Sequence, residues 1–161
     1  MHVRKVAVLS LSISLALSLS ACATGKDAPT KKVTQVTDGV DGSISTYGNN
    51  LKISSVLLVA QSDGSSVLVG TITNENPTED TLVGITVGGV HATLSHANLP
   101  LKQNEPVRFA GDSANASAVV TGLNVAPGTR VKVQLSFASA GEITLDAIVR
   151  ERSGVFANVG A

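Results

Sequence analysis

The sequence predicts an all-β domain, a β-sandwich of about seven to eight short strands. Apolar and polar residues alternate along several stretches beyond residue 50, which is the period of a strand with one buried and one solvated face. Clusters of Gly, Asn, Asp, Ser and Pro separate these stretches at regular spacing. Nothing after residue 22 repeats at a convincing helical period, so the pattern favours strands throughout.

The first expected strand is the apolar, β-branched run at 51–60, which a polar turn at 62–65 follows. Gly88 and Gly89 predict a bulge or tight turn rather than a phosphate-binding loop, because no helix follows them. Asp80, after a polar loop, is interpreted as a turn or strand cap rather than a catalytic acid. The remaining runs of this region are 67–74, 81–87, 90–96, 106–111 and 118–123.

The clearest alternation lies near the C-terminus, where 130–137 and 142–149 are each expected to bury every second residue. The four residues between these runs are enough to close a hairpin. The expected buried residues are Val131, Val133, Leu135, Phe137, Ile143, Leu145, Ala147 and Val149. With no Trp and only 2% aromatic residues, the core must be aliphatic.

A segment of another kind opens the chain. Arg4 and Lys5 give it a basic start, and an apolar run broken only by serines follows over 6–19. This order is typical of a secretory signal peptide, predicted here for residues 1–21. The run is shorter than the roughly 20 residues of a membrane-spanning helix.

Leu19, Ser20, Ala21 and Cys22 resemble the lipobox of bacterial lipoproteins, in which the cysteine sulfur receives a diacylglycerol and cleavage leaves that cysteine first. The resemblance implies a lipid attached at Cys22 and a protein anchored on the extracytoplasmic face of the cell membrane. The alternative is an ordinary signal peptide followed by an unrelated cysteine. Because Cys22 is the only cysteine, its lipidation leaves no thiol for a disulfide, redox chemistry or a metal.

The rest of the chain is divided by composition. Residues 22–47 begin with the cysteine that the lipobox resemblance implies is lipidated, and their few large apolar side chains predict a flexible tether after it. Residues 48–150 are expected to form the folded domain, and 151–161 a C-terminal tail. Without the signal peptide, ten basic residues face twelve acidic ones, a net charge of about −2 that argues against nucleic-acid binding.

Two stretches, 72–87 (ITNENPTEDTLVGITV) and 122–149 (GLNVAPGTRVKVQLSFASAGEITLDAIV), resemble the periplasmic copper chaperone family called PCu(A)C. The shared features are a polar loop leading into an Asp-x-Leu-Val strand, and a Gly-Leu followed by a Val-x-Leu-x-Phe-x-x-Ala-Gly hairpin. The likeness covers roughly residues 46–150 and extends to actinobacterial-type lipoproteins built on this domain. It implies a cupredoxin-like Greek-key β-sandwich.

The resemblance also implies where copper would bind. The family holds copper with two His and two Met, and thioether sulfur selects Cu(I). By spacing from Leu82, His96 takes the place of the first His, whereas Ser117 and Val119 take the places of the second His-x-Met pair. The only methionine is Met1, which leaves with the signal peptide, so the Met ligands are missing.

His91 and His96 are then the remaining imidazoles. Their odd separation places them on opposite faces of an undistorted strand, so they cannot share an ion unless a bulge intervenes. His91 is expected to face solvent and His96 to lie on the rim of the sandwich. We interpret both as structural or surface histidines. A weak divalent site at His96 with a carboxylate such as Glu105 is the alternative, and His91 is a still weaker candidate.

These observations predict a non-enzymatic, membrane-anchored binding or interaction module on a PCu(A)C-like scaffold with a degenerate copper site. Its partners are the membrane, through Cys22, and another envelope protein or ligand. The sequence contains no nucleophile elbow, no His-x-His pair and no Glu-x-x-His pair, so no motif indicates an enzyme. No cofactor is expected. The alternative function is copper binding or metal handling through His96.

The lipid anchor leads to a first prediction. Cys22→Ala removes the sulfur that the lipid requires, so we expect loss of metabolic lipid labelling and accumulation of unprocessed or released protein. Fractionation with labelled fatty acid measures both effects. Retention of an unlabelled Cys22→Ala protein in the membrane fraction would contradict the lipoprotein interpretation.

Overall fold

The computed structural model describes residues 39–160, which contain eleven β-strands and no α-helix. The signal peptide, Cys22 and the first part of the expected tether therefore lie outside the described residues. Across 39–160, no helix has the length and apolar character needed to cross a membrane. The strands are β1 (Val40–Ile44), β2 (Leu51–Ala60), β3 (Ser66–Asn74), β4 (Asp80–Val87), β5 (Val90–His91), β6 (Thr93–Leu94), β7 (Leu99–Leu101), β8 (Val107–Arg108), β9 (Ala118–Val120), β10 (Arg130–Phe137) and β11 (Gly141–Glu151).

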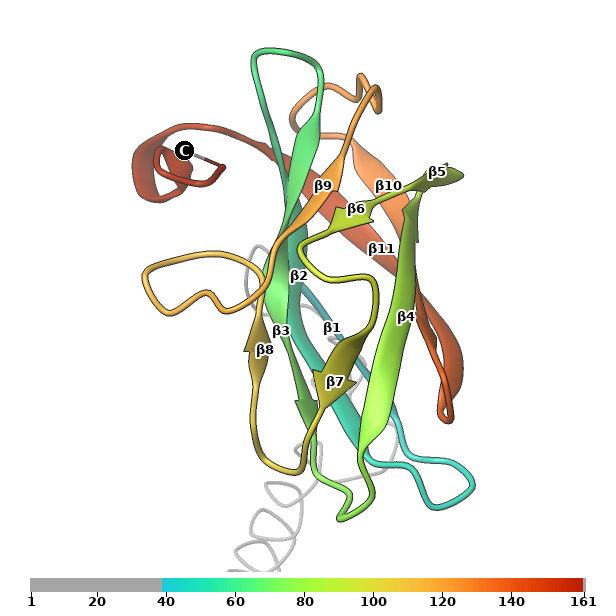
Figure 1. Ribbon diagram of the computed structural model, residues 1–161. Helices are drawn as coiled ribbons and strands as arrows, with labels where there is room; N and C mark the ends of the chain where they lie inside the picture. Colours follow the sequence, from blue (N-terminus) through green and yellow to red (C-terminus); the bar gives the residue numbers. More distant parts are fainter. Residues whose placement is uncertain (1–38, 161) are drawn as a thin grey trace, which may run out of the picture. The chain divides into compact units, whose positions relative to one another are not determined.

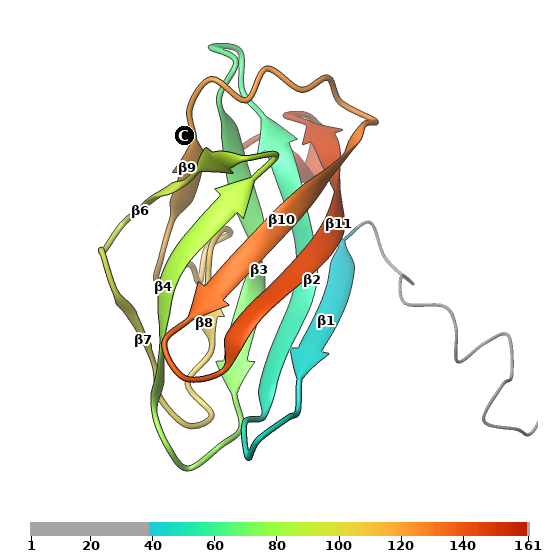
Figure 2. The same cartoon turned by 90° about the vertical axis from the view of Figure 1, so that its right-hand side faces the viewer.

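The strands form two layers that share β11 (Figures 1 and 2). One layer is built on β4, β10 and the first part of β11, and the other on β1, β2 and β3. β11 pairs with β10 in antiparallel fashion up to Ile148 and then with β2 in parallel fashion from Val149. Because one strand belongs to both sheets, the sandwich is continuous and barrel-like, in agreement with the predicted cupredoxin-like β-sandwich.

The predicted C-terminal hairpin is confirmed. β10 and β11 pair in register from Arg130 opposite Ile148 to Phe137 opposite Gly141. The expected inward residues Val133, Leu135, Phe137, Leu145, Ala147 and Val149 are buried, whereas Val131 and Ile143 pack half-buried against the same core. The core is almost wholly aliphatic, so its stability comes from many modest side chains rather than a few large aromatic ones.

The tether prediction is wrong over its last part. Val40–Ile44, which we assigned to the tether, forms β1 and pairs with β2, burying Val40 and Ile44. A bulge shifts the register, and Asp41 Oδ1 accepts a 2.6 Å hydrogen bond from the backbone N–H of Ser55. The bulge lies in β2, where two residues lie opposite one of β1, and β1 itself alternates. Gly42 holds its middle inward position, so only Val40 and Ile44 mark the buried face. The folded part therefore already includes residues before 48.

The expected strand 90–96 is divided in two. β5 pairs with β4, whereas β6 pairs with β9, so the chain crosses between the sheets at Ala92. Such short strands, together with β1, raise the number from the expected seven or eight to eleven. The turn at Gly88 and Gly89 is confirmed: it joins β4 to β5, and both residues have positive φ (+56° and +88°), as a two-residue hairpin turn requires.

The expected C-terminal tail also has structure. β11 extends to Glu151, and a 3-10 turn, η3, covers Gly154–Phe156. The segment then returns towards the β2–β3 end of the sheet, where Gln61 Nε2 donates a 3.4 Å hydrogen bond to Val159 O. Residues 151–160 therefore include the end of a core strand and a segment that contacts the domain.

Two buried polar side chains hold the strand ends together. The Asp80 carboxylate accepts hydrogen bonds from the backbone N–H groups of Thr81, Ser139 and Ala140, at 2.7, 2.9 and 2.9 Å. Asp80 therefore caps the start of β4 and fastens it to the β10–β11 turn, as its interpretation as a cap predicted. Asn74 Nδ2 donates to the carbonyls of Thr78 and Leu101, both at 2.8 Å.

Phe137 tests the assignment of faces. Its side chain is buried at the end of β10, and truncation of a buried aromatic costs about 3–5 kcal/mol. We expect Phe137→Ala to lower the free energy of unfolding by this amount in urea denaturation. Gln134→Ala, on the opposite face of the same strand, removes a surface hydrogen bond to Glu142 and should cost less than about 1 kcal/mol. Equally small losses for both variants would show that the faces are wrongly assigned.

Asp80 tests the cap. Asp80→Ala leaves three backbone donors without their acceptor, and we expect a loss of about 3 kcal/mol or more in the free energy of unfolding. Asp80→Asn keeps one acceptor oxygen and should lose less. The control is Asp146→Asn, whose exposed carboxylate lies 3.8 Å from Lys132 Nζ and contributes less than about 1 kcal/mol. Similar stability of the Asp80→Ala and Asp146→Asn proteins would exclude a structural role for the Asp80 carboxylate.

Candidate functional site

The segments that carry His96 and Ser117 lie beside each other. β6 pairs with β9, with Thr93 opposite Val119. Just beyond this pairing, Ser95 N donates to Ser117 O at 2.9 Å, and Ser117 N donates to Ser95 Oγ at 3.2 Å. The fold thus brings together the two places where the family resemblance implies copper ligands.

The side chains at this junction carry few metal donors. His96 is exposed, and its Nδ1 lies 3.2 Å from Ser95 Oγ. Ser117 and Val119 bring a hydroxyl group and an aliphatic group where soft donors would be needed for Cu(I). Among residues 39–160, no group of three or more His, Cys, Asp or Glu side chains is arranged to hold a metal ion.

His91 belongs to a different part of the sheet. It lies on β5 opposite Thr86 of β4, and its exposed ring has Nδ1 3.0 Å from Thr86 Oγ1. We expected the two histidines to be separated by opposite faces of one strand. In the structure the two histidines belong to different sheets, because the chain has crossed to the other sheet before it reaches His96.

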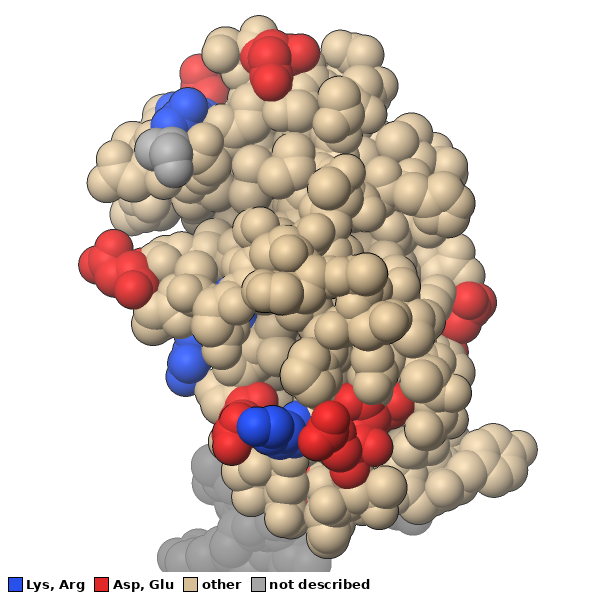
Figure 3. Space-filling view, viewed as in Figure 1, with Lys and Arg blue, Asp and Glu red and all other residues tan. Residues whose placement is uncertain are grey.

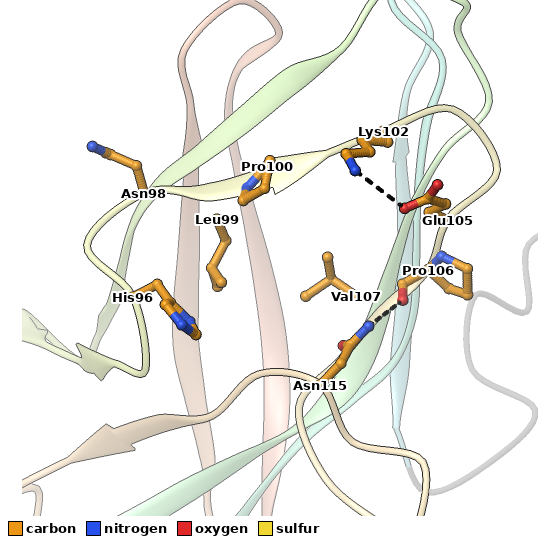
Figure 4. Close-up of a pocket in the computed structure, with 9 residues that line it drawn as sticks. All are labelled: His96, Asn98, Leu99, Pro100, Lys102, Glu105, Pro106, Val107 and Asn115. Carbon is orange, nitrogen blue, oxygen red and sulfur yellow. Dashed lines mark hydrogen bonds and ion pairs between the residues drawn. The ribbon is translucent and has the colours of Figure 1, made fainter.

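A pocket of about 350 Å³ lies next to His96, between the neighbouring strands β7 and β8 (Figures 1 and 4). The buried side chains of Leu99 and Val107 form its apolar part. Polar side chains from the flanking loops surround them. The lining residues are His96, Asn98, Leu99, Pro100, Lys102, Glu105, Pro106, Val107 and Asn115.

His96 and Glu105, which we had considered as joint ligands of a divalent ion, both line this pocket. Figure 4 shows them on opposite sides of it, with the apolar side chains between them. Glu105 Oε2 instead lies 3.9 Å from Lys102 Nζ, in an ion pair at the rim. The pocket therefore separates the imidazole from a loosely held pair of opposite charges.

Asn115 closes the outer edge of β8. Its Oδ1 accepts from the Arg108 N–H at 2.7 Å, and its Nδ2 donates to Pro106 O at 3.0 Å. The side-chain amide thereby replaces the peptide group of a neighbouring strand. The sequence analysis missed Asn115, Asn98 and Lys102, and no spacing or motif in the chain identifies them, because loops of different length bring them together.

Charged side chains are sparse over this face. Figure 3 shows a largely uncharged middle in the orientation of Figure 1, with charged side chains of both signs near the upper and lower ends. Away from the pocket, the hydroxyl and the backbone N–H of Ser65 hold the pKa of Asp63 below its ordinary value of 3.8. Asp63 lies in the predicted turn between β2 and β3, so this hydrogen bonding supports the turn and not the pocket.

Comparison with known proteins gives a structural likeness only. No family model and no curated protein matches the sequence. Among solved structures, the apo PCuAC domain from PmoF1 aligns with a TM-score of 0.56 and 21% identity, covering 69% of this chain and 98% of that one. The copper-bound PCuAC domain from PmoF2 aligns at 0.58 and 19%, covering 69% and 97%, and its apo form at 0.52 and 19%, covering 65% and 92%. The chain therefore has a PCuAC-like fold.

Proposed function

We propose that the protein is a lipoprotein, anchored through Cys22 on the extracytoplasmic face of the cell membrane, and that its PCuAC-like domain is a non-enzymatic binding module with a degenerate copper site. The observation that carries the proposal is the junction of Ser95, His96 and Ser117. The two segments meet there, but hydroxyl and aliphatic side chains stand in place of thioethers. The scaffold is kept while the soft donors that retain Cu(I) are lost.

The environment of the polar groups supports a non-enzymatic role. Ser95 Oγ accepts a backbone hydrogen bond from Ser117, and no acidic side chain of the described part orients the His96 ring. A serine nucleophile needs a base that is itself oriented by a third group. Asp80, the most buried carboxylate described, is occupied by three backbone N–H groups.

Copper handling through His96 is the second candidate, and the ring geometry favours it. If Nδ1–H donates to Ser95 Oγ, the ring is in the tautomer that leaves Nε2 for a metal. One imidazole does not make a trigonal or tetrahedral Cu(I) site, so a partner would have to supply the other ligands. Copper is the metal considered for this candidate because one of the structural neighbours is a copper-bound PCuAC domain.

Competition with a tight Cu(I) chelator tests the proposal on the purified full-length protein. We expect the protein to yield its Cu(I) under conditions in which the PmoF2 domain, as the positive control, retains it. Any Cu(II) binding should weaken by about tenfold in His96→Ala, a loss of ~1.4 kcal/mol, and change little in His91→Ala. Stoichiometric Cu(I) retained by the protein alone would restore the copper-chaperone function.

A further inference from the structure

The pocket between β7 and β8 is large enough to hold a small molecule. Its volume of about 350 Å³ lies at the lower end of the range for ligand pockets, about 300–1,000 Å³. Strand pairing fixes its apolar side chains, since Leu99 lies opposite Leu82 of β4 and Val107 opposite Ile72 of β3. Both side chains are less than 10% exposed and belong to the main core. The apolar wall of the pocket is therefore in place before a ligand binds.

The strand edges that border the pocket are closed to an added strand. Pro100 and Pro106 have no backbone N–H to offer. On β8, the N–H of Arg108 and the carbonyl of Pro106 are taken by Asn115. The Arg108 carbonyl accepts from the backbone N–H groups of Asn115 and Ala116. An extended peptide therefore finds no main-chain partner at Pro106 and Arg108 and no donor at Pro100, which favours a small ligand.

The rim presents one positive and one negative group side by side. Lys102 Nζ lies 3.9 Å from Glu105 Oε2, and the two residues are joined by a turn in which Glu105 N donates to Lys102 O at 3.2 Å. Both side chains are more than half exposed (57% and 70%), so this ion pair contributes little by itself. A ligand can replace it at low cost. Figure 4 shows the pair beside the apolar wall formed by Leu99 and Val107.

These three features match a single kind of molecule. An α-amino acid carries a carboxylate and an ammonium group on one carbon, so both charges can meet their opposites at Lys102 and Glu105. An aliphatic side chain from the same carbon can then lie in the apolar part of the pocket, against Pro100, Pro106 and the accessible edges of Leu99 and Val107. An aliphatic carboxylate alone would meet Glu105 as a like charge, and an aliphatic amine alone would meet Lys102.

We propose that this pocket binds a free aliphatic α-amino acid, with its carboxylate at Lys102, its ammonium group at Glu105 and its side chain against Leu99 and Val107. The inference rests on the proposed function of a binding module and names its ligand class.

Isothermal titration of the purified full-length protein tests the proposal with three matched probes. L-leucine carries both charges, 4-methylpentanoate only the carboxylate, and 3-methylbutylamine only the ammonium group. We expect saturable binding of leucine, with each single-charge analogue weaker by about tenfold or more, a difference of ~1.4 kcal/mol. No binding of leucine, or equal binding of all three probes, would overturn the proposal.

Variants test the roles of the two charges. Lys102→Gln and Glu105→Gln should each weaken leucine binding by about tenfold. Lys52→Gln is the control, since Lys52 pairs with Glu75 and does not line the pocket. Unchanged leucine binding in the Lys102 and Glu105 single variants would contradict the assignment. The Cu(I) competition measures copper retention and the titration measures leucine binding. A failure of the proposed function is therefore distinguishable from a failure of the amino-acid proposal.

Discussion

The buried carboxylate of Asp80 is the interaction on which the arrangement of the strands depends most. Its three backbone hydrogen bonds join the start of β4 to the turn between β10 and β11, and Asp80 also pairs with Leu101 of β7. Asn74 acts at the end of β3 in the same way, because its amide donates to the carbonyl of Leu101. A buried acceptor or donor that serves several backbone groups is costly to remove, since each group would be left without a partner away from water. β7 is therefore held to the sandwich at Leu101 from both layers.

The candidate site follows from this attachment. β7 is held to β4 and β8 to β3, and the pocket lies where these two short strands face each other without pairing. Pro100 and Asn115 keep the two edges from attracting further strands, as proteins with exposed edges require. Pro100 and Asn115, which prevent edge-to-edge association, also line the cavity with their side chains. Specificity in such a cavity depends on Lys102, Glu105 and the apolar wall rather than on the backbone.

The described part of the chain has a core made almost entirely of aliphatic side chains. Its core is a continuous aliphatic cluster, and the buried residues of β2, β4, β10 and β11 supply most of it. The junction of Ser95 and Ser117 is held by their own hydrogen bonds, so the two segments meet without an ion to bridge them.

Patterns local to the chain determined the β class, the C-terminal hairpin with its buried face, the Gly88–Gly89 turn and the capping role of Asp80. Alternation and turn chemistry act between residues that are close in sequence, so they are visible without a structure. Only the tertiary structure decided that Val40–Ile44 is a strand, because Gly42 leaves just two apolar side chains on its buried face and the pairing with β2 supplies the rest of its stability. It also decided that the run 90–96 divides between two sheets at Ala92. The pocket is likewise a tertiary result: it forms where loops and strand edges distant in the sequence converge, and no local preference records such contacts.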